Sequence, residues 1–318
     1  MSVWVTVLLF LVGLVLIIKG GDWFLSGAVW IAEATGVPRI YYRSNHCVCG
    51  HDAAGADSFC DGVLQNEVDM AVGNAVGSVT ANLGLILGIS VVCIPSVVHK
   101  QQFRLKALLM AASALLLFLL CRGGRLTVGP SLCLVAVFTA YLVSNLTDAR
   151  TSMAENRTES GRGRSVSRRQ LAGKLTAFVV GIAAIVMGSQ MLICYGSKIA
   201  ILLGVPAGII GVTMVAIGTS LPELVTTLTA ISRREASMSV GNIIGANVID
   251  LTMILPVCSA VSGGRLTLSR QTIGLDMPVC LGMCALAVLP PLIKGRFYRW
   301  QGVLMLAAYI VYVAALVR

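Results

Sequence analysis

Charged residues are scarce in this chain of 318 residues: Asp, Glu, Lys and Arg together make up 12% of it, whereas 57% of it is hydrophobic. A soluble globular domain has about 25% charged residues, so the composition excludes a protein of that class. Apolar runs of roughly 17–25 residues are the spanning unit of helical membrane proteins. The shortage of charge therefore predicts an all-α polytopic membrane protein whose surroundings are the lipid bilayer.

The N-terminus also lacks the features of a cleaved signal peptide. No basic residue precedes Lys19, and no small-residue cleavage site follows the first apolar run. We therefore expect residues 3–18 to belong to an uncleaved span. The ten cysteines are scattered, most of them through apolar segments, which is typical of small buried side chains and not of a disulfide framework.

About ten apolar runs are long enough to cross a membrane. The first contains the adjacent Gly20 and Gly21, which permit a kink, and the second is unusually polar. The expected spans are approximately 3–30, 37–63, 70–98, 104–121, 126–146, 173–202, 206–231, 237–262, 271–293 and 299–317.

The net charge of +10 is explained by the orientation of the loops and needs no nucleic-acid partner. Loops on the cytoplasmic side of a membrane protein are enriched in Lys and Arg. If the N-terminus is outside, alternate loops place sixteen basic residues inside and six outside. We therefore expect a multi-pass protein of the plasma (inner) membrane with both termini on the non-cytoplasmic side. The sixteen are Arg39, Lys100, Arg104, Lys106, Arg150, Arg157, Arg162, Arg164, Arg168, Arg169, Lys174, Arg233, Arg234, Lys294, Arg296 and Arg299.

The chain consists of two related halves, residues 1–146 and 173–318, joined by a basic polar segment at 147–172 that we expect to be a flexible cytoplasmic loop. Gly36-Val37-Pro38 recurs as Gly204-Val205-Pro206, and the GNAVG that starts at Gly73 recurs as the GNIIG that starts at Gly241. Both pairs have the same separation along the chain, which we call the repeat offset. Five spans in each half is an odd number, so the second half must insert upside down. This five-plus-five inverted repeat is the plan of many secondary transporters, whose site lies at mid-membrane between the repeats.

The second half contains the motif most informative about function, GTSLPE at 218–223, followed by GNIIGANVID at 241–250. Glu223 and Asp250 are carboxylates within apolar segments, and ionisable groups inside a membrane are expensive and mark ion pathways. Pro222 removes a backbone donor, which frees the carbonyl of Gly218. Carboxylate, hydroxyl and carbonyl oxygens are the ligands that hard cations such as Ca²⁺ prefer.

These two motifs resemble the signature repeat of the cation/calcium antiporter superfamily, in particular the sodium/calcium exchangers of the bacterial type. The resemblance implies antiport of calcium against sodium by alternating access, with potassium as a further option, no resident cofactor and no enzymatic activity. It also implies an ion site formed by both repeats. Ala246 and Val79 depart from the family pattern, which usually has serine at the first position and often asparagine at the second. The implied site residues are Glu223, Asp250, Thr219, Ser220, Ala216, Asn247, Ser78 and Asn82.

The first repeat breaks where the family has its second glutamate. The repeat offset places that glutamate at position 55, which is Gly55, inside the polar segment 41–65. Reading the codons of this segment one base later permits an apolar sequence in which Ala53-Ala54-Gly55 becomes Leu-Pro-Glu. One base gained near Ile40 and one lost before Met70 would leave the offset unchanged on both sides. We therefore interpret 41–65 as a frameshifted stretch, whether by sequencing error or by mutation.

Three alternatives stay open at this point. His46, Cys47, Cys49, His51 and Cys60 are a candidate metal cluster, although their spacing fits no standard zinc pattern. A chain without its first-repeat glutamate is a candidate transport-inactive copy. Coupling to protons in place of sodium would make the protein a calcium/proton exchanger. Oligomeric state and stoichiometry are not determined by the sequence.

Overall fold

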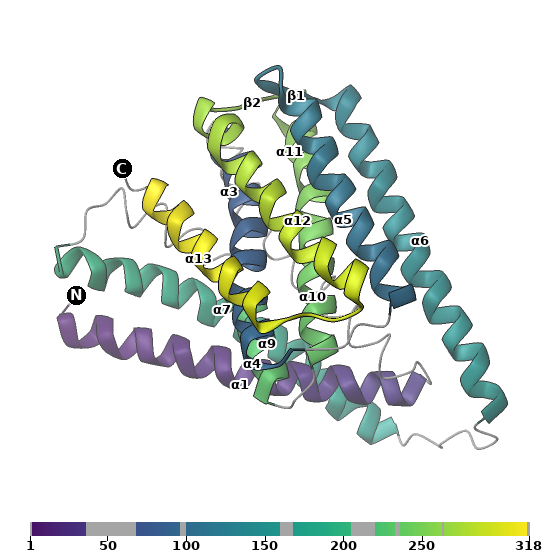
Figure 1. Ribbon diagram of the computed structural model, residues 1–318. Coiled ribbons are helices and arrows are strands. Elements are labelled where there is room, and N and C mark those ends of the chain that lie inside the picture. Colours follow the sequence, from purple (N-terminus) through teal and green to yellow (C-terminus); the bar gives the residue numbers. More distant parts are fainter. Residues whose placement is uncertain are drawn as a thin grey trace.

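The computed structural model describes residues 2–35, 68–95, 100–159, 168–204, 220–232, 236–262 and 264–316. These residues form a bundle of helices with one short two-stranded ribbon (Figure 1). Eight stretches among them are long and apolar enough to cross a membrane. The prediction of an all-α polytopic membrane protein is confirmed, while the expected span 37–63 lies wholly, and the expected span 206–231 partly, outside the described residues.

Each half of the chain contributes its own set of helices to the bundle. The first half contributes α1 (Val3–Thr35), α3 (Val68–Ala81), the π-helical η1 (Asn82–Leu87), α4 (Gly88–Cys93), α5 (Lys100–Cys121) and α6 (Val128–Glu159). The second half contributes α7 (Arg168–Leu202), α9 (Leu221–Ser232), α10 (Ala236–Ile249), the π-helical η2 (Asp250–Ile254), α11 (Leu255–Val261), the π-helical η3 (Thr272–Asp276), α12 (Met277–Lys294) and α13 (Arg299–Leu316).

The inverted repeat is visible at the centre of the bundle. The rod α3–η1–α4 covers 68–93 and the rod α10–η2–α11 covers 236–261, so the repeat offset relates them at both ends. The π-helical segments begin at Asn82 and Asp250, which have the same separation. The two rods run in opposite directions, since α3 lies above α4 and α10 lies below α11 (Figure 1).

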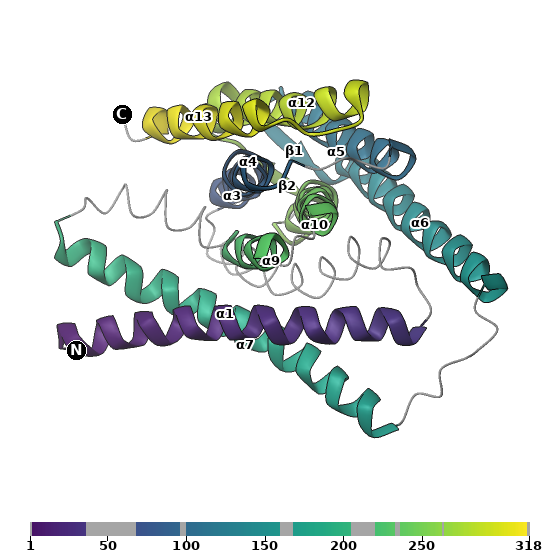
Figure 2. The same ribbon diagram turned by 60° about the horizontal axis from the view of Figure 1, so that its bottom comes forward.

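Helices α1 and α7 cross each other beside this central group (Figure 2). A Cβ atom at Gly188 would lie 2.7 Å from the carbonyl oxygen of Gly13, and one at Gly20 would lie 3.0 Å from that of Gly181. Gly13 and Gly181 are repeat equivalents, as are Gly20 and Gly188, so the contact is symmetric. Helix α1 continues unbroken through Gly20 and Gly21, and its glycines serve close helix approach.

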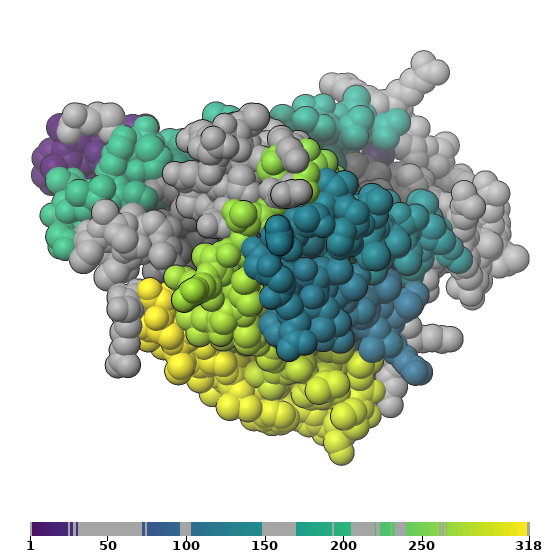
Figure 3. Space-filling view, turned by 90° about the horizontal axis from the view of Figure 1, so that it is seen from above, coloured from purple at the N-terminus to yellow at the C-terminus, as the bar shows by residue number. Residues whose placement is uncertain are grey.

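A two-stranded antiparallel ribbon joins the halves at one end of the bundle. Strand β1 (Arg125–Thr127) connects α5 to α6, strand β2 (Arg265–Thr267) connects α11 to α12, and Leu126 pairs with Leu266. Both leucines are fully buried. From this side, the surface of α5 abuts that of α12 (Figure 3). We call this end the ribbon face, and the opposite end, where α5 and α7 begin and α12 ends, the basic face.

The predicted loop at 147–172 is shorter in the structure. Helix α6 continues to Glu159 and α7 already begins at Arg168. The residues between 147 and 159 include Ala, Met, Glu and Arg but neither Gly nor Pro, so helix propensity extends α6 beyond its apolar part.

Gln301 of α13 provides hydrogen bonds that two prolines remove from α12. Pro290 and Pro291 have no N–H and leave the carbonyls of Leu286 and Ala287 without their helical donors. The fully buried Gln301 of α13 donates from Nε2 to both, at 2.7 Å to Leu286 O and 3.5 Å to Ala287 O.

We expect Gln301→Leu to destabilise the protein by about 1–3 kcal/mol, because two buried carbonyls lose their donor. Thermal unfolding of the detergent-solubilised protein measures this effect. Gln170→Leu, at an exposed position of α7, is the matched control and should leave the midpoint nearly unchanged. Equal unfolding midpoints for both variants would contradict a stabilising role of the two Gln301 hydrogen bonds.

Candidate ion-binding site

The two central rods and the start of α9 bring six of the predicted site residues together. Ser78 lies in the last turn of α3 and Asn82 begins η1. Asn247 lies on α10 and Asp250 begins η2. Ser220 directly precedes α9, and Glu223 lies in its first turn. All six are buried, and Glu223, the most exposed of them, keeps only 7% of its surface. The site is therefore assembled from both repeats.

Ser78 forms the first link between the repeats. Its Oγ lies 3.3 Å from Ser220 Oγ and donates to Asp250 Oδ2 at 3.2 Å. Three oxygen-bearing side chains from three elements thus meet at one point, although 142 and 172 residues separate Ser78 from its two partners.

Two asparagines form the second link between the rods. Asn82 Nδ2 donates to Asn247 Oδ1 at 3.0 Å, and Asn247 Nδ2 donates to Met110 Sδ of α5 at 3.6 Å. Asn82 Oδ1 is buried and accepts no hydrogen bond from the described part of the chain. A buried amide oxygen without a donor is costly, and a cation is one partner that would offset this cost.

The two carboxylates give the site its negative charge. Glu223 interacts electrostatically with Asp250, so both carboxylates act within one site. Like charges taken out of water repel each other, and a bound cation removes the repulsion. Among the described residues there is no group of three or more His, Cys, Asp and Glu side chains that would hold a soft metal. The donors present are oxygens, which suits hard cations.

The π-helical segments explain how the two rods orient Asn82 and Asp250 toward the site. A π-helical turn widens the helix and changes the direction of the residues at its start, and such turns are frequent at functional sites. Asn82 and Asp250 stand at the first position of η1 and η2. The same local distortion in each repeat therefore positions one oxygen-bearing side chain from each.

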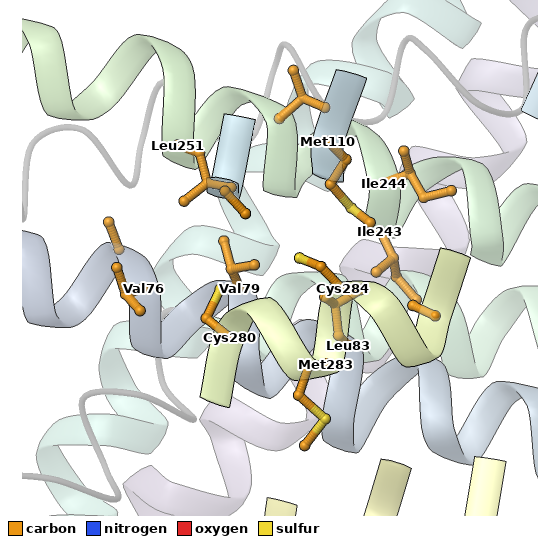
Figure 4. Close-up of a cluster of buried hydrophobic side chains, with 14 of the residues drawn as sticks. Val76, Val79, Leu83, Met110, Ile243, Ile244, Leu251, Cys280, Met283 and Cys284 are labelled. Atoms are coloured by element: carbon orange, nitrogen blue, oxygen red, sulfur yellow. The ribbon is translucent and has the colours of Figure 1, made fainter. Parts of the chain in front are cut away.

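Figure 4 shows buried apolar side chains on the same elements that carry the site. Val79 and Leu83 pack beside Cys280 and Cys284 of α12. Leu251, which follows Asp250, is fully buried in the same cluster. Such packing excludes water and strengthens electrostatic attraction to a bound ion.

Several sequence predictions for the site fall outside the described residues. These are Ala216, Thr219, the freed carbonyl of Gly218, and Gly55 with the cluster of His46, Cys47, Cys49, His51 and Cys60. Pro222 lies in the first turn of α9, where a missing N–H costs nothing. Met110, which contacts Asn247, was not predicted, because an apolar residue on an apolar helix carries no signal.

The model of the sodium/calcium exchanger protein family matches residues 60–147 and 174–318 of this chain. The chain belongs to the sodium/calcium exchanger family. It is 29% identical to a membrane protein of Methanocaldococcus jannaschii over 96% of both chains, and 26% identical to the sodium/calcium exchanger MaX1 of Methanosarcina acetivorans over 98% of both. The Escherichia coli inner membrane protein YrbG is 27% identical over 81% of this exchanger chain and 80% of its own.

A solved structure extends this similarity to the fold of the exchanger. The sodium-calcium exchanger NCX_Mj, soaked with Na⁺ and Sr²⁺, matches with a TM-score of 0.82 and 27% identity over 99% of both chains. The chain is thus a multi-pass integral membrane protein of an ion-transport family. Residues 1–59 lie outside both segments that the family model matches, and they include most of the anomalous stretch 41–65.

Proposed function

We propose that this chain exchanges calcium for sodium across the membrane by alternating access. The observation that carries the proposal is the buried cluster of oxygens at the meeting point of two inverted rods, with Ser78 bonded to Asp250 and within 3.3 Å of Ser220. A site between inverted repeats can open to either side of the membrane when one repeat moves against the other.

The site residues have distinct roles in this proposal. Glu223 and Asp250 supply the charge that calcium requires, and sodium ions balance the same charge when calcium leaves. Ser220, Ser78 and the amide oxygen of Asn82 complete the oxygen shell, while Asn247 orients Asn82. Ala216 and Thr219 join this set by the family pattern. Potassium is left out, because MaX1 and NCX_Mj, which match over nearly the whole chain, are named as sodium/calcium exchangers.

The test is radiocalcium uptake into vesicles that contain the full chain. An outward sodium gradient should drive uptake, and a pH gradient without sodium should not. Uptake driven by the pH gradient alone would favour a calcium/proton exchanger instead. Uptake with neither gradient would reject antiport.

A second candidate function is a transport-inactive copy, and one specific observation favours it. In the family pattern Glu223 has a partner carboxylate in the first repeat, and the repeat offset places that partner at Gly55. The same uptake assay separates the two candidates, since an inactive copy would take up no calcium under any gradient.

We further propose that the basic face is cytoplasmic and that both termini lie on the other side. Lys100, Arg168 and Lys294 all lie at this face, which agrees with the enrichment of basic residues in cytoplasmic loops. A protease site appended after Arg318 should be cleaved from the periplasmic side of intact spheroplasts. Cleavage only after lysis would reverse the assignment.

A further inference from the structure

A third buried carboxylate lies outside the ion-binding site. Asp276 is the last residue of η3, retains 4% of its surface, and lies within the apolar stretch Thr272–Lys294 that is long enough to span the membrane. Its repeat equivalent in the first half is Leu108, so the repeat does not explain it. An ionisable group inside a membrane is costly unless it has a functional or structural partner.

Hydroxyl groups connect Asp276 to the ribbon face. Half-buried Ser269 follows β2 by two residues, and its Oγ lies 2.9 Å from Thr272 Oγ1. The Thr272 side chain in turn hydrogen-bonds Asp276. Ser269 directly precedes the helical turn that carries Thr272 and Asp276, and the spacing of three and four residues brings the three groups to one side of it. The result is an unbroken chain of groups that can both donate and accept protons, leading from the surface to a buried acid.

On its other side Asp276 contacts α13, which packs against the ion-binding site. Tyr312 OH donates to Asp276 Oδ1 at 3.0 Å, and the rings of Tyr312 and Tyr309 lie 6.4 Å apart. Tyr309 packs so closely on η1 that a Cβ atom at Gly84 would lie 2.7 Å from its own Cβ. Gly84 is two residues after Asn82, so α13 links Asp276 to a segment of the site.

The remaining groups near Asp276 are neutral or distant. Among the described side chains, α13 presents Tyr312 and Tyr309, and α12 presents Cys280 near Tyr312. Helix α3 presents Gly73 toward Thr272, and Arg270 is exposed at the ribbon face. No lysine or arginine in this described set is positioned to neutralise the carboxylate.

We propose that Asp276 is a proton-binding site, reached from the ribbon face through Ser269 and Thr272, and that its protonation acts on the ion-binding site through Tyr312 and α13. Binding of a proton turns the carboxylate from an acceptor of the Tyr312 hydrogen bond into a group that also donates. The hydrogen bond that Tyr312 donates is weaker to a neutral carboxyl than to a carboxylate, and α13 transmits this change to η1. The proton site goes beyond calcium/sodium exchange and does not depend on it, whereas its effect on transport rests on the proposed function.

Infrared difference spectroscopy of the purified full chain tests the proton site without any transport. On lowering the pH from about 9 to about 5, a range that includes the titration of many buried carboxyl groups, the protein should gain a C=O stretch of a protonated carboxyl. Asp276→Asn should lose this band, and Asp22→Asn on α1 should keep it. Tyr312→Phe keeps the carboxyl and should shift the band, so the proposal stays testable if Asp276→Asn does not fold. A full set of bands in Asp276→Asn, or an unshifted spectrum in Tyr312→Phe, would overturn the site.

Sodium-driven calcium uptake tests the link to transport. The maximal rate should depend on the pH at the ribbon face in the parent chain, and this dependence should be lost in Asp276→Asn. A pH effect on apparent calcium affinity should remain, because protons compete with calcium at Glu223 and Asp250. An unchanged pH profile of the maximal rate would overturn the link. No uptake by the parent chain would reject the proposed function, while the infrared band would still decide the proton site.

Discussion

Replacing Glu223 with glutamine is expected to abolish sodium-driven calcium uptake. Glutamine keeps the size and one oxygen of the side chain but removes one of two negative charges in a site with 7% residual exposure at this residue. The number of charged ligands strongly tunes calcium affinity. We expect at least about a hundredfold loss of apparent affinity, equivalent to about 3 kcal/mol of binding free energy.

The measurement is initial uptake over a range of calcium concentrations. Glu159→Gln at the far end of α6 is the matched control, because it makes the same chemical change away from the rods (Figure 1). Its uptake should equal that of the parent chain. Uptake that survives Glu223→Gln undiminished would remove this carboxylate, and with it the proposed site, from the transport mechanism.

Restoring the reading frame across 41–65 is expected to increase calcium uptake by a comparable factor. The restored segment replaces Ala53-Ala54-Gly55 with Leu-Pro-Glu and so supplies a carboxylate at the repeat equivalent of Glu223. It also replaces a polar segment with an apolar one that can cross the bilayer, where unpaired polar groups are costly.

The comparison uses the chain as written, the frame-restored chain, and the frame-restored chain with Glu223→Gln. Uptake should rise with restoration and fall again with the substitution. Uptake that appears only after restoration would identify the chain as written as the transport-inactive copy. Equal uptake in the first two would refute a need for the second glutamate. Codons at 53–55 that cannot encode Leu-Pro-Glu in the shifted frame would refute the frameshift itself.

Much of the architecture was predictable because its signals are periodic. Eight described apolar stretches match the spans expected from hydropathy, since a membrane admits only helices or closed barrels. The repeat offset, found from two short glycine motifs, recurs in the bounds of the two rods and in the starts of η1 and η2. The predicted loop at 147–172 was too long, because hydropathy marks the apolar part of a helix and not its polar continuation, here to Glu159.

The sequence predicted which residues belong to the site but not which of them contact one another. Ser78, Asn82, Ser220, Glu223, Asn247 and Asp250 were named from the motifs and their resemblance to the exchanger family, and the fold buries them together. That Ser78 bonds Asp250 and Asn82 bonds Asn247 depends on how the rods cross. Asp276 was a detectable intramembrane acid, yet its partner Tyr312 lies 36 residues away on another helix.

By itself the sequence determined that the chain is a membrane protein with two inverted halves and an acidic motif of the kind typical of ion sites, because composition and repeats are properties of the linear chain. Only the tertiary structure showed which oxygens share a site and which glycines let α1 and α7 cross. It also showed that Gln301 donates to the carbonyls that the two prolines leave without a helical donor. Those features arise between helices, and a contact between helices depends on their crossing and rotation, which no local pattern encodes.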